Sequence, residues 1–422
     1  MSATDSTAQW KPAEKFAFRF LFLFLGFFLL NYEVAMASLY YRFYKKLGKI
    51  YGWFDRPLHW LDQHLYHIGY DPNVHESMPG DNHFGAVWYV TAIIIFFIAT
   101  IIWSILDRRR ENYDKLYYWF RVYVRCMVAI IMFGYGMNKL FPSQMTYPNV
   151  EQLLTPIGNQ GRFQTIWTMI GASPAYEMFT GLCEVIASLL LVFGRTYVFG
   201  CLFMCTVLCN VVALNIFYNI PVKMYSSLLL VCILFLLGSH MRKLFHFFFF
   251  GETETLSEKR FGFQPGRKKY VVITLTTIVP LLLFGDMVYK ENKLYKKYHG
   301  YLQDQKLFEV TTFILKDTLA PLTTDTLRWK RFAIPYKNSV AIFDMQDNPT
   351  DYDCDVDTLH QLYRIHDNAD SSKWDTLYYH PQQNKMMNLL GKWKGNNVNI
   401  LLKEFAIDSM ILNKDKITFL SD

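Results

Sequence analysis

The stretch GAVWYVTAIIIFFIATIIWSIL, residues 85–106, decides the fold class of this chain, because none of its 22 residues carries a charged side chain. A helix of about 20 apolar residues is long enough to cross the hydrocarbon core of a lipid bilayer. Further apolar runs of similar length occur at approximately 16–38, 118–140, 174–194, 196–218, 221–240 and 269–289. The sequence therefore predicts an α-helical polytopic membrane bundle of about seven spans. The first run lacks a small-residue cleavage site, so we expect a retained span rather than a signal peptide.

The polar part of the chain lies at its C-terminal end. Of the 422 residues, 52% are hydrophobic and only 19% are charged, against about a quarter charged in average proteins. From Lys290 to Asp422 there are 18 basic and 18 acidic residues, so the net charge of +7 belongs to residues 1–289. From about residue 309, apolar and polar residues alternate in short runs between turn-like clusters, which is typical of antiparallel strands. We therefore predict a transmembrane helical domain over 1–290 and a mainly antiparallel β domain over 291–422, as a sandwich or small barrel.

Basic residues that flank the spans predict the orientation, since short loops rich in Lys and Arg stay in the cytoplasm. With seven spans, four basic groups fall on one side, among them Arg108–Arg110 and Arg267–Lys269. This arrangement places the N-terminus in the cytoplasm and the β domain in the periplasm of a bacterial inner membrane. The basic residues between Leu39 and Ile68 fall on the other side, on an amphipathic segment that we expect at the membrane interface.

Polar side chains within the spans are the best markers of a functional site, because they are costly there and usually face the bundle interior or a cavity. The third span carries Arg125 and Lys139, nearly four helical turns apart on one face. The fourth carries Glu177 and Glu184. Five polar groups fall near the outer ends of their spans and could converge on one outward-facing pocket: Glu33, Lys139, Glu177, Asn215 and Lys223. Arg125 and Glu184 lie deeper and could pair below it.

Two interpretations of these polar groups stay open. In the first they form a ligand site, with Lys139 as a cation or catalytic base. The ligand-binding residues would then be Glu33, Arg125, Glu177, Glu184, Asn215 and Lys223. In the second interpretation the same groups pair with one another and only hold the bundle together.

Motifs for metal, nucleotide or nucleophilic chemistry are missing from the sequence. The histidines between His59 and His83 lack a Cys or Glu at a recognised spacing, so we expect no metal site there. The acidic run Asp344–Asp357 lacks the glycine and closing Glu of the usual calcium loop. No nucleotide-binding glycine loop, nucleophile elbow or zinc-helix motif occurs. We therefore expect neither a soluble-type enzyme nor a nucleic-acid partner.

Three stretches carry a family resemblance: GYGMNKLFP (Gly134–Pro142), YEMFTGLCEVIASLLLVFGR (Tyr176–Arg195) and FYNIPVKMYSS (Phe217–Ser227). They resemble the DoxX-like family of small bacterial membrane proteins, over a core at about 118–240. By position, the resemblance makes Lys139, Glu184 and Arg195 the family's typical polar residues. The additional spans and the β domain look like the enlarged versions encoded by Bacteroidetes-type bacteria.

The resemblance implies a function that the residues alone do not. The family's name comes from a likeness to a membrane subunit of a thiosulfate–quinone oxidoreductase. It implies a redox-associated subunit that binds a quinone or another lipid-soluble small molecule, with a partner protein that carries haem, flavin or metal. One alternative is a non-enzymatic scaffold or chaperone whose β domain binds an envelope partner. A distant likeness to vitamin K-dependent gamma-glutamyl carboxylases implies instead base chemistry at Lys139.

Overall fold

The computed structural model describes residues 9–30, 54–72, 81–252, 270–271, 273–303, 305–315, 317–318, 327–366, 374–410 and 412. The chain divides into two compact units, which are described separately. The helical unit comprises Met1–Leu140 and Phe179–Lys290, and the barrel unit comprises Phe141–Met178 and Glu291–Asp422. The division falls within two helices, α7 (Pro174–Val192) and α12 (Val279–Gln303).

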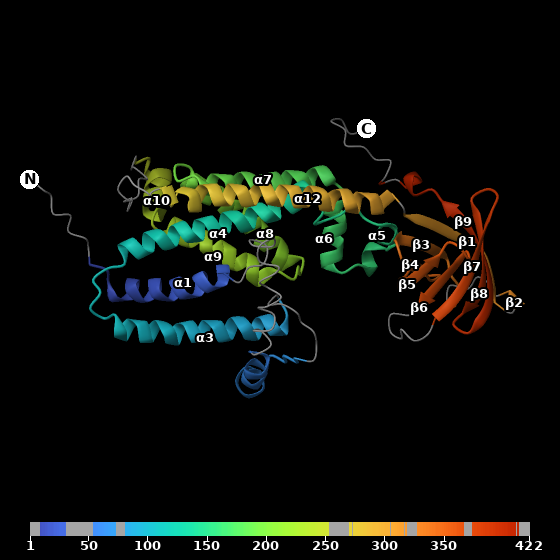
Figure 1. Ribbon diagram of the computed structural model, residues 1–422, viewed down its shortest axis with the longest axis horizontal. Helices are drawn as coiled ribbons and strands as arrows, with labels where there is room; N and C mark the ends of the chain where they lie inside the picture. Colours follow the sequence, from blue (N-terminus) through green and yellow to red (C-terminus); the bar gives the residue numbers. More distant parts are fainter. Residues whose placement is uncertain are drawn as a thin grey trace, which may run out of the picture. The chain divides into compact units, whose positions relative to one another are not determined.

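The helical unit is built from long helices that pack side by side. Besides the parts of α7 and α12 that belong to it, its main elements are α1 (Pro12–Leu30), α3 (His83–Leu106), α4 (Asp114–Leu140), α8 (Tyr197–Phe217), α9 (Lys223–Gly238) and α10 (Met241–Phe250). Helix α1 packs between α3 and α4, and α9 packs against both α4 and α8 (Figure 1). Two short π-helical turns lie at Asp62–Tyr66 and Thr274–Ile278.

Four of the described helices are long and apolar enough to cross a membrane: α3, α4, α7 and α8. Helices α9 and α10 are bent by 75° against each other and add a fifth candidate if they count as one span. The expected number of seven spans is not confirmed. The first expected span, 16–38, corresponds to α1 as far as Leu30 and then leaves the described residues. The seventh, 269–289, overlaps α12, which does not meet the same criteria in its described part.

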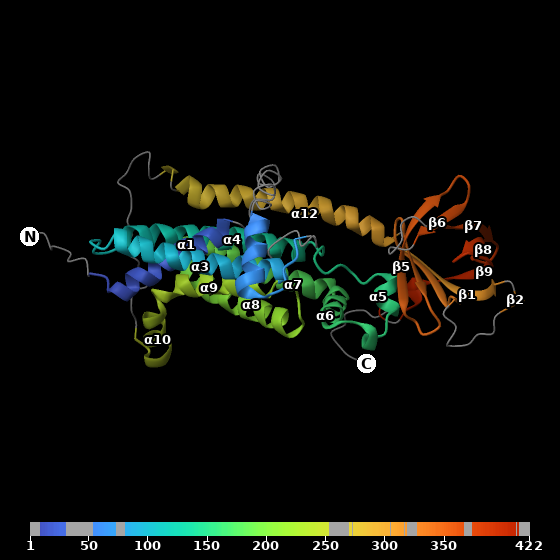
Figure 2. The same ribbon diagram turned by 90° about the horizontal axis from the view of Figure 1, so that it is seen from below.

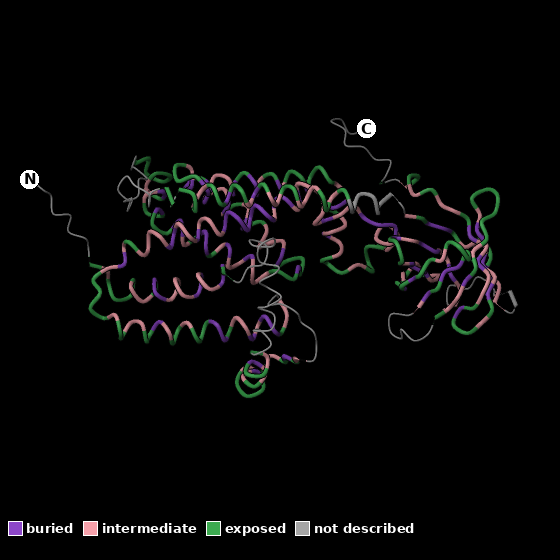
Figure 3. Tube along the Cα trace, in the orientation of Figure 1, coloured by how far each residue is buried: buried purple, intermediate pink, exposed green. Residues whose placement is uncertain are grey.

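Helix α3 shows why these helices suit a lipid environment. Its most apolar 18-residue window is only 17% buried, and Figure 3 shows an alternation of exposed and half-buried positions along it. The exposed side chains include Ile93, Ile95, Phe97 and Ile98. A contiguous apolar surface of this kind marks a membrane or interaction surface in folded proteins.

The barrel unit contains eight antiparallel strands that close into a ring (Figure 2). They are β1 (Lys306–Leu315), β3 (Arg331–Tyr336), β4 (Ser339–Phe343), β5 (Pro349–Asp357), β6 (Leu362–His366), β7 (Trp374–Gln382), β8 (Met386–Trp393) and β9 (Asn396–Phe405). Each strand pairs with the next, and β9 pairs back onto β1, from Leu307 opposite Phe405 to Leu315 opposite Val398. The short β2 (Asp317–Thr318) adds to β1. Of the two expected architectures, the structure therefore has the barrel, whose closure removes exposed sheet edges.

The core of the barrel is rich in aromatic side chains. Trp329 stacks on Phe332 with ring centroids 5.8 Å apart and meets the edge of Trp393 at 5.0 Å. Phe313, Phe332 and Leu377 are at most 1% exposed. Because β-strands place alternate side chains on opposite faces, these residues follow from the alternation in the sequence.

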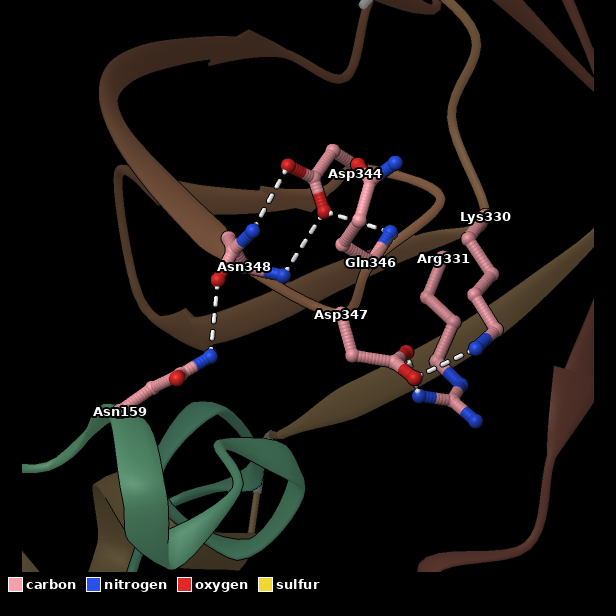
Figure 4. A network of polar contacts seen from close by, with 7 residues as sticks. All are labelled: Asn159, Lys330, Arg331, Asp344, Gln346, Asp347 and Asn348. Atoms are coloured by element: carbon pink, nitrogen blue, oxygen red, sulfur yellow. Dashed lines mark hydrogen bonds and ion pairs between the residues drawn. The ribbon is translucent and has the colours of Figure 1, made fainter. Parts of the chain in front are cut away.

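The acidic run Asp344–Asp357 is a turn followed by a strand, and not one loop. In β5, Tyr352 and Cys354 are buried while Asp351, Asp353 and Asp355 are exposed, as strand alternation requires. The preceding turn is organised by Asp344, whose carboxylate accepts hydrogen bonds from the backbone N–H groups of Gln346, at 2.9 Å, and Asn348, at 2.8 Å (Figure 4). The carboxylates of this run are thus distributed between the turn and the outer face of the strand.

Residues 141–178 pack with the strands, although the expected domain limits place them in the helical domain. They contain α5 (Val150–Leu154), the 3-10 turn Ile157–Asn159 and α6 (Arg162–Gly171). Val150 is buried in a cluster with Leu307, Ala333 and Phe343. Its backbone N–H donates to Gln305 at 2.9 Å. The physical reason is the apolar face of α5, which is too short, at five residues, to show a helical pattern in the sequence.

Candidate functional site

Two glycines bring helices α4 and α7 into backbone contact. A Cβ atom added to Gly181 would lie 2.6 Å from the carbonyl oxygen of Gly136 and 2.7 Å from the backbone nitrogen of Leu140. A Cβ atom added to Gly136 would lie 2.9 Å from the carbonyl oxygen of Gly181 and 2.8 Å from a methyl group of Val185. These pairings run in opposite directions along the two helices, so α4 and α7 cross antiparallel. Small residues permit such close approach between helices.

The same crossing joins Lys139 to Glu184 in a buried ion pair. Each charged residue follows its glycine by three positions, as Gly136–Lys139 in α4 and Gly181–Glu184 in α7. In this antiparallel register Gly136 lies level with Val185, and Leu140 with Gly181, so Lys139 and Glu184, which fall between these two levels, face each other. The ammonium group of Lys139 donates to Oε1 of Glu184, and the side chains are only 9% and 2% exposed. The pair therefore lies in a nearly water-free environment.

One oxygen of this pair has no hydrogen-bond donor in the described part of the chain. Oε2 of Glu184 is buried and unsatisfied, whereas Oε1 is bound to Lys139. A buried carboxylate oxygen without a donor costs about 1–3 kcal/mol or more in free energy. Such a group is suited to accept a hydrogen bond from a ligand. Base chemistry at Lys139 would first require that its contact with Glu184 break.

Arg125 lies away from Glu184, although the two residues could have paired according to the sequence. Fourteen residues separate Arg125 from Lys139, which is about 21 Å along α4. Its guanidinium stands over the ring of Tyr197, 5.4 Å from the centroid. Glu184 is paired with Lys139 instead, because the crossing of α4 and α7 lies at the Gly136 end.

Asn215 and Lys223 are each bound within their own neighbourhood. The buried side chain of Asn215 donates to the hydroxyl of Ser226 at 2.9 Å, which ties α8 to α9. The ammonium group of Lys223 lies 3.6 Å from Asp81. Asp81 also accepts hydrogen bonds from the backbone N–H groups of Lys223 and Met224, and so caps α9. These contacts agree with the interpretation in which polar groups hold the bundle together.

Glu177 and Glu33 are the remaining site residues expected from the sequence. Glu177 is fully buried in the barrel unit, where its carboxylate accepts a hydrogen bond from the backbone N–H of Met145 at 2.9 Å. Glu33 lies outside the described residues. Of the five polar groups expected to share a pocket, only Lys139 remains in the candidate site of the helical unit, where it pairs with the deeper Glu184.

Sequence reasoning missed a second polar cluster in the helical unit. Arg121 of α4 is buried and donates to the carbonyl oxygen of Leu236 at 2.8 Å and to the hydroxyl of Tyr197 at 3.3 Å. The Tyr197 hydroxyl is also hydrogen-bonded to Nε2 of His240. This chain links α4, α8 and the end of α9. The four-residue spacing of Arg121 and Arg125, one turn apart on one face, was the available signal.

Neither candidate metal cluster gains support within the described residues. No group of three or more His, Cys, Asp or Glu side chains there is arranged to hold a metal ion. Asp62 accepts hydrogen bonds from the backbone N–H groups of Ile68, Gly69 and Tyr70 at 2.7 to 2.9 Å. Burial opposes its charge, but these three donors hold the pKa of Asp62 below its usual value. The ring of His59 is bound to the carbonyl oxygen of Tyr70, and His75 lies outside the described residues.

The fold and the site together define a class: a helical domain with membrane-compatible helices and a buried ion pair, followed by a closed antiparallel β-barrel. No family model and no solved structure matches the chain. The chain is 32% identical over 119 residues to the uncharacterized protein YwoB of Bacillus subtilis (strain 168). This match covers 28% of the chain and 75% of YwoB. The chain therefore belongs to the family of YwoB, through about a quarter of its length.

Proposed function

We propose that this protein is a DoxX-like subunit of a bacterial inner membrane that binds a quinone-like molecule at the Lys139–Glu184 pair. Its N-terminus faces the cytoplasm and its β-barrel faces the periplasm. The proposal is carried by one observation, the buried pair in which Oε2 of Glu184 has no donor among the described residues. The other contacts of the ligand would be apolar and would involve aromatic side chains of the helices.

The chemistry of the pair matches that of a quinone and its reduced form. A quinone presents carbonyl oxygens, which accept hydrogen bonds from an ammonium group such as that of Lys139. The quinol presents hydroxyl groups, which donate to a carboxylate oxygen such as Oε2 of Glu184. Hydrogen bonds to charged groups are worth about 1.5–3 kcal/mol. The electrons would come from a partner protein, because the sequence contains no haem, flavin or metal motif.

Titration of the full-length protein in lipid nanodiscs with menadiol, the soluble quinol form of menadione, under anaerobic conditions tests the proposal, with tryptophan fluorescence as the readout. We expect saturable binding that weakens about tenfold or more in Glu184→Gln, which keeps the shape but loses the charge. The matched control, Asp347→Asn in the barrel unit, removes the same charge from another ion pair and should bind as the wild type does. Equal binding by wild type and Glu184→Gln, or none by either, would overturn the proposal.

A second function is a membrane-anchored scaffold for an envelope partner. It is favoured by the local contacts of Asn215 with Ser226 and of Lys223 with Asp81. In this case the charged residues serve only the stability of the helical unit. A stoichiometric partner that co-purifies from native membranes and stays bound to a Lys139→Ala, Glu184→Ala variant would support the scaffold. Loss of the partner in that variant, with the protein still folded, would count against it.

A further inference from the structure

Arg125, in the N-terminal half of α4, differs from the buried Arg19 of the same helical unit. Arg19 is 4% exposed, and each of its nitrogens has a protein acceptor: Nε donates to the Tyr113 hydroxyl at 2.9 Å, and the terminal nitrogens donate to Ser104 and the Asp107 carbonyl oxygen. Arg125 has a buried Nε without an acceptor in the described part of the chain. Its described contacts are the Tyr197 ring and the thiol of neighbouring Cys126. A half-buried guanidinium whose Nε has no acceptor among the described residues is suited to an anion from outside the chain.

Arg121 adds a second positive charge on the same face of α4. It lies one helical turn before Arg125 and is 7% exposed. The guanidinium groups of both arginines approach the ring of Tyr197, at 6.0 Å and 5.4 Å from its centroid. Two guanidinium groups that converge in this way favour a phosphate group, because each offers planar pairs of N–H donors to its oxygens.

Helix α10 indicates the depth of this cluster in a bilayer. It begins directly after His240 and is turned by 75° from α9. It combines exposed phenylalanines, among them Phe247–Phe250, with the exposed Arg242 and the half-buried Lys243. A basic, aromatic helix turned away from the spans is typical of the headgroup region. Figures 1 and 2 both place α10 at the end of the helical unit where α4 begins.

His240 connects this interfacial helix to the arginines. Its ring is hydrogen-bonded to Tyr197, which in turn receives a hydrogen bond from Arg121. The arginines therefore lie at the level where α10 starts, and that level carries the lipid phosphates. Arg125 is about 21 Å along α4 from Lys139. The two sites are therefore separate from each other.

We infer that Arg125 and Arg121 bind the phosphate group of an anionic phospholipid at the cytoplasmic end of the helical unit, beside Tyr197. The inference rests on the membrane location proposed above, but not on ligand binding at the Lys139–Glu184 pair. The occupant is a lipid and not free phosphate, because α10 brings an apolar, aromatic surface to the same level.

Native mass spectrometry of the delipidated full-length protein, with phosphatidylglycerol or phosphatidylcholine added back, tests this inference. We expect the wild type to retain phosphatidylglycerol in preference to phosphatidylcholine. This preference should fall about tenfold in Arg125→Gln, because a charge-assisted hydrogen bond is lost. Arg125→Lys keeps the charge but loses the planar donors, so its preference for phosphatidylglycerol should be intermediate between those of the wild type and Arg125→Gln. Arg109→Gln, an exposed charge in the loop after α3, is the matched control and should behave as the wild type.

Two results would overturn the lipid assignment. One is equal phosphatidylglycerol retention by wild type and Arg125→Gln, with both proteins folded by thermal unfolding. The other is protection of the wild type against thermal unfolding by millimolar inorganic phosphate, lost in Arg125→Gln, without any preference for phosphatidylglycerol. If the wild type shows no preference for phosphatidylglycerol but still binds menadiol, this inference fails and the proposed function stands.

Discussion

The protein holds the same kind of ion pair in two very different environments. In the helical unit, Lys139 and Glu184 are 9% and 2% exposed, and Glu184 uses only one of its oxygens. In the barrel unit, Asp347 is 24% exposed and binds Lys330 through one oxygen and Arg331 through the other (Figure 4). Both carboxylate oxygens of Asp347 have a partner, and water reaches them. In the buried pair, one oxygen of Glu184 has no donor among the described residues, and the side chains are shielded from water. The contrast shows that the surroundings of a pair, more than the contact, decide its energy and its readiness for a ligand.

The largest effect is expected from breaking the buried pair on one side. Glu184→Ala leaves the ammonium of Lys139 buried without its carboxylate, and we expect a loss of about 3–5 kcal/mol in the free energy of unfolding. Replacing both residues, Lys139→Met with Glu184→Leu, should restore most of this loss, since no charge is then buried. Denaturation by SDS, monitored by tryptophan fluorescence, measures the stability of the single and the double variant. A double variant as unstable as the single one would contradict the interdependence of the pair.

The glycine contact that positions the pair can be tested next. In Gly181→Ala the new methyl group would overlap backbone atoms of Gly136 and Leu140, which cannot move independently of α4. We expect destabilisation by about 1–3 kcal/mol through overpacking. The control is Gly285→Ala in α12, where an added Cβ meets no atom within 4 Å. It should leave stability unchanged or raise it by up to about 1 kcal/mol through helix propensity. Equal effects of the two substitutions would refute the close crossing.

Much of the helical unit follows from the sequence, because an apolar run of bilayer length is a local property. The expected limits 85–106, 118–140 and 174–194 agree with α3, α4 and α7 to within four residues at each end. The expected limit at residue 240 agrees with the end of α9, but α10, which follows after a bend of 75°, was not predicted. The strand β5 was missed because its aspartates suggest a loop, although the alternation of Tyr352 and Cys354 with acidic residues was present in the sequence.

The candidate site was predictable as residues but not as contacts. Lys139 and Glu184 stand out because charged side chains in apolar runs are rare. Their pairing depends on the register of two antiparallel helices, which composition does not contain, although the matching spacing of Gly136–Lys139 and Gly181–Glu184 was a usable signal. Closure of the barrel likewise joins its first and last strands, β1 and β9, which are distant in the sequence, as in the pairing of Leu307 with Phe405.

The carboxylate of Glu151 in α5, within the barrel unit, is half-buried and so intermediate in exposure between these two pairs. It gives a pH-dependent test. Burial, together with the charge of Asp351 and a hydrogen bond to it, raises the pKa of Glu151 to about 7. The folded state therefore holds a proton that the unfolded state releases near pH 4.5. The contribution of Glu151 to the free energy of unfolding is therefore fully present below pH 4.5 and is lost as the pH rises through about 7.

We expect the midpoint temperature of the barrel unit to fall by about 2–4 °C over this range, because partial exposure weakens the interaction. Glu151→Gln, which imitates the protonated acid, should flatten the dependence and be the more stable form at pH 8. Thermal unfolding of the full-length protein at several pH values measures it. A wild-type slope that persists in Glu151→Gln would assign the dependence to another group.

The smallest effect is expected at the surface pair of the barrel. Asp347→Asn removes its ion pairs with Lys330 and Arg331, which are 35% and 21% exposed. Exposed ion pairs contribute about 0.2–1 kcal/mol each, and salt screens them. The loss in the free energy of unfolding should therefore shrink further at high salt. A loss comparable to that in Glu184→Ala would abolish the distinction between the two environments.

A cryo-electron microscopy map of the full-length protein, purified from native membranes without delipidation, tests the central claim most directly. The account predicts non-protein density between α4 and α7 within hydrogen-bond distance of Oε2 of Glu184 and the ammonium group of Lys139. Protein side chains packed around a closed Lys139–Glu184 pair, with no such density, would contradict it and leave the pair a structural element of the helical unit.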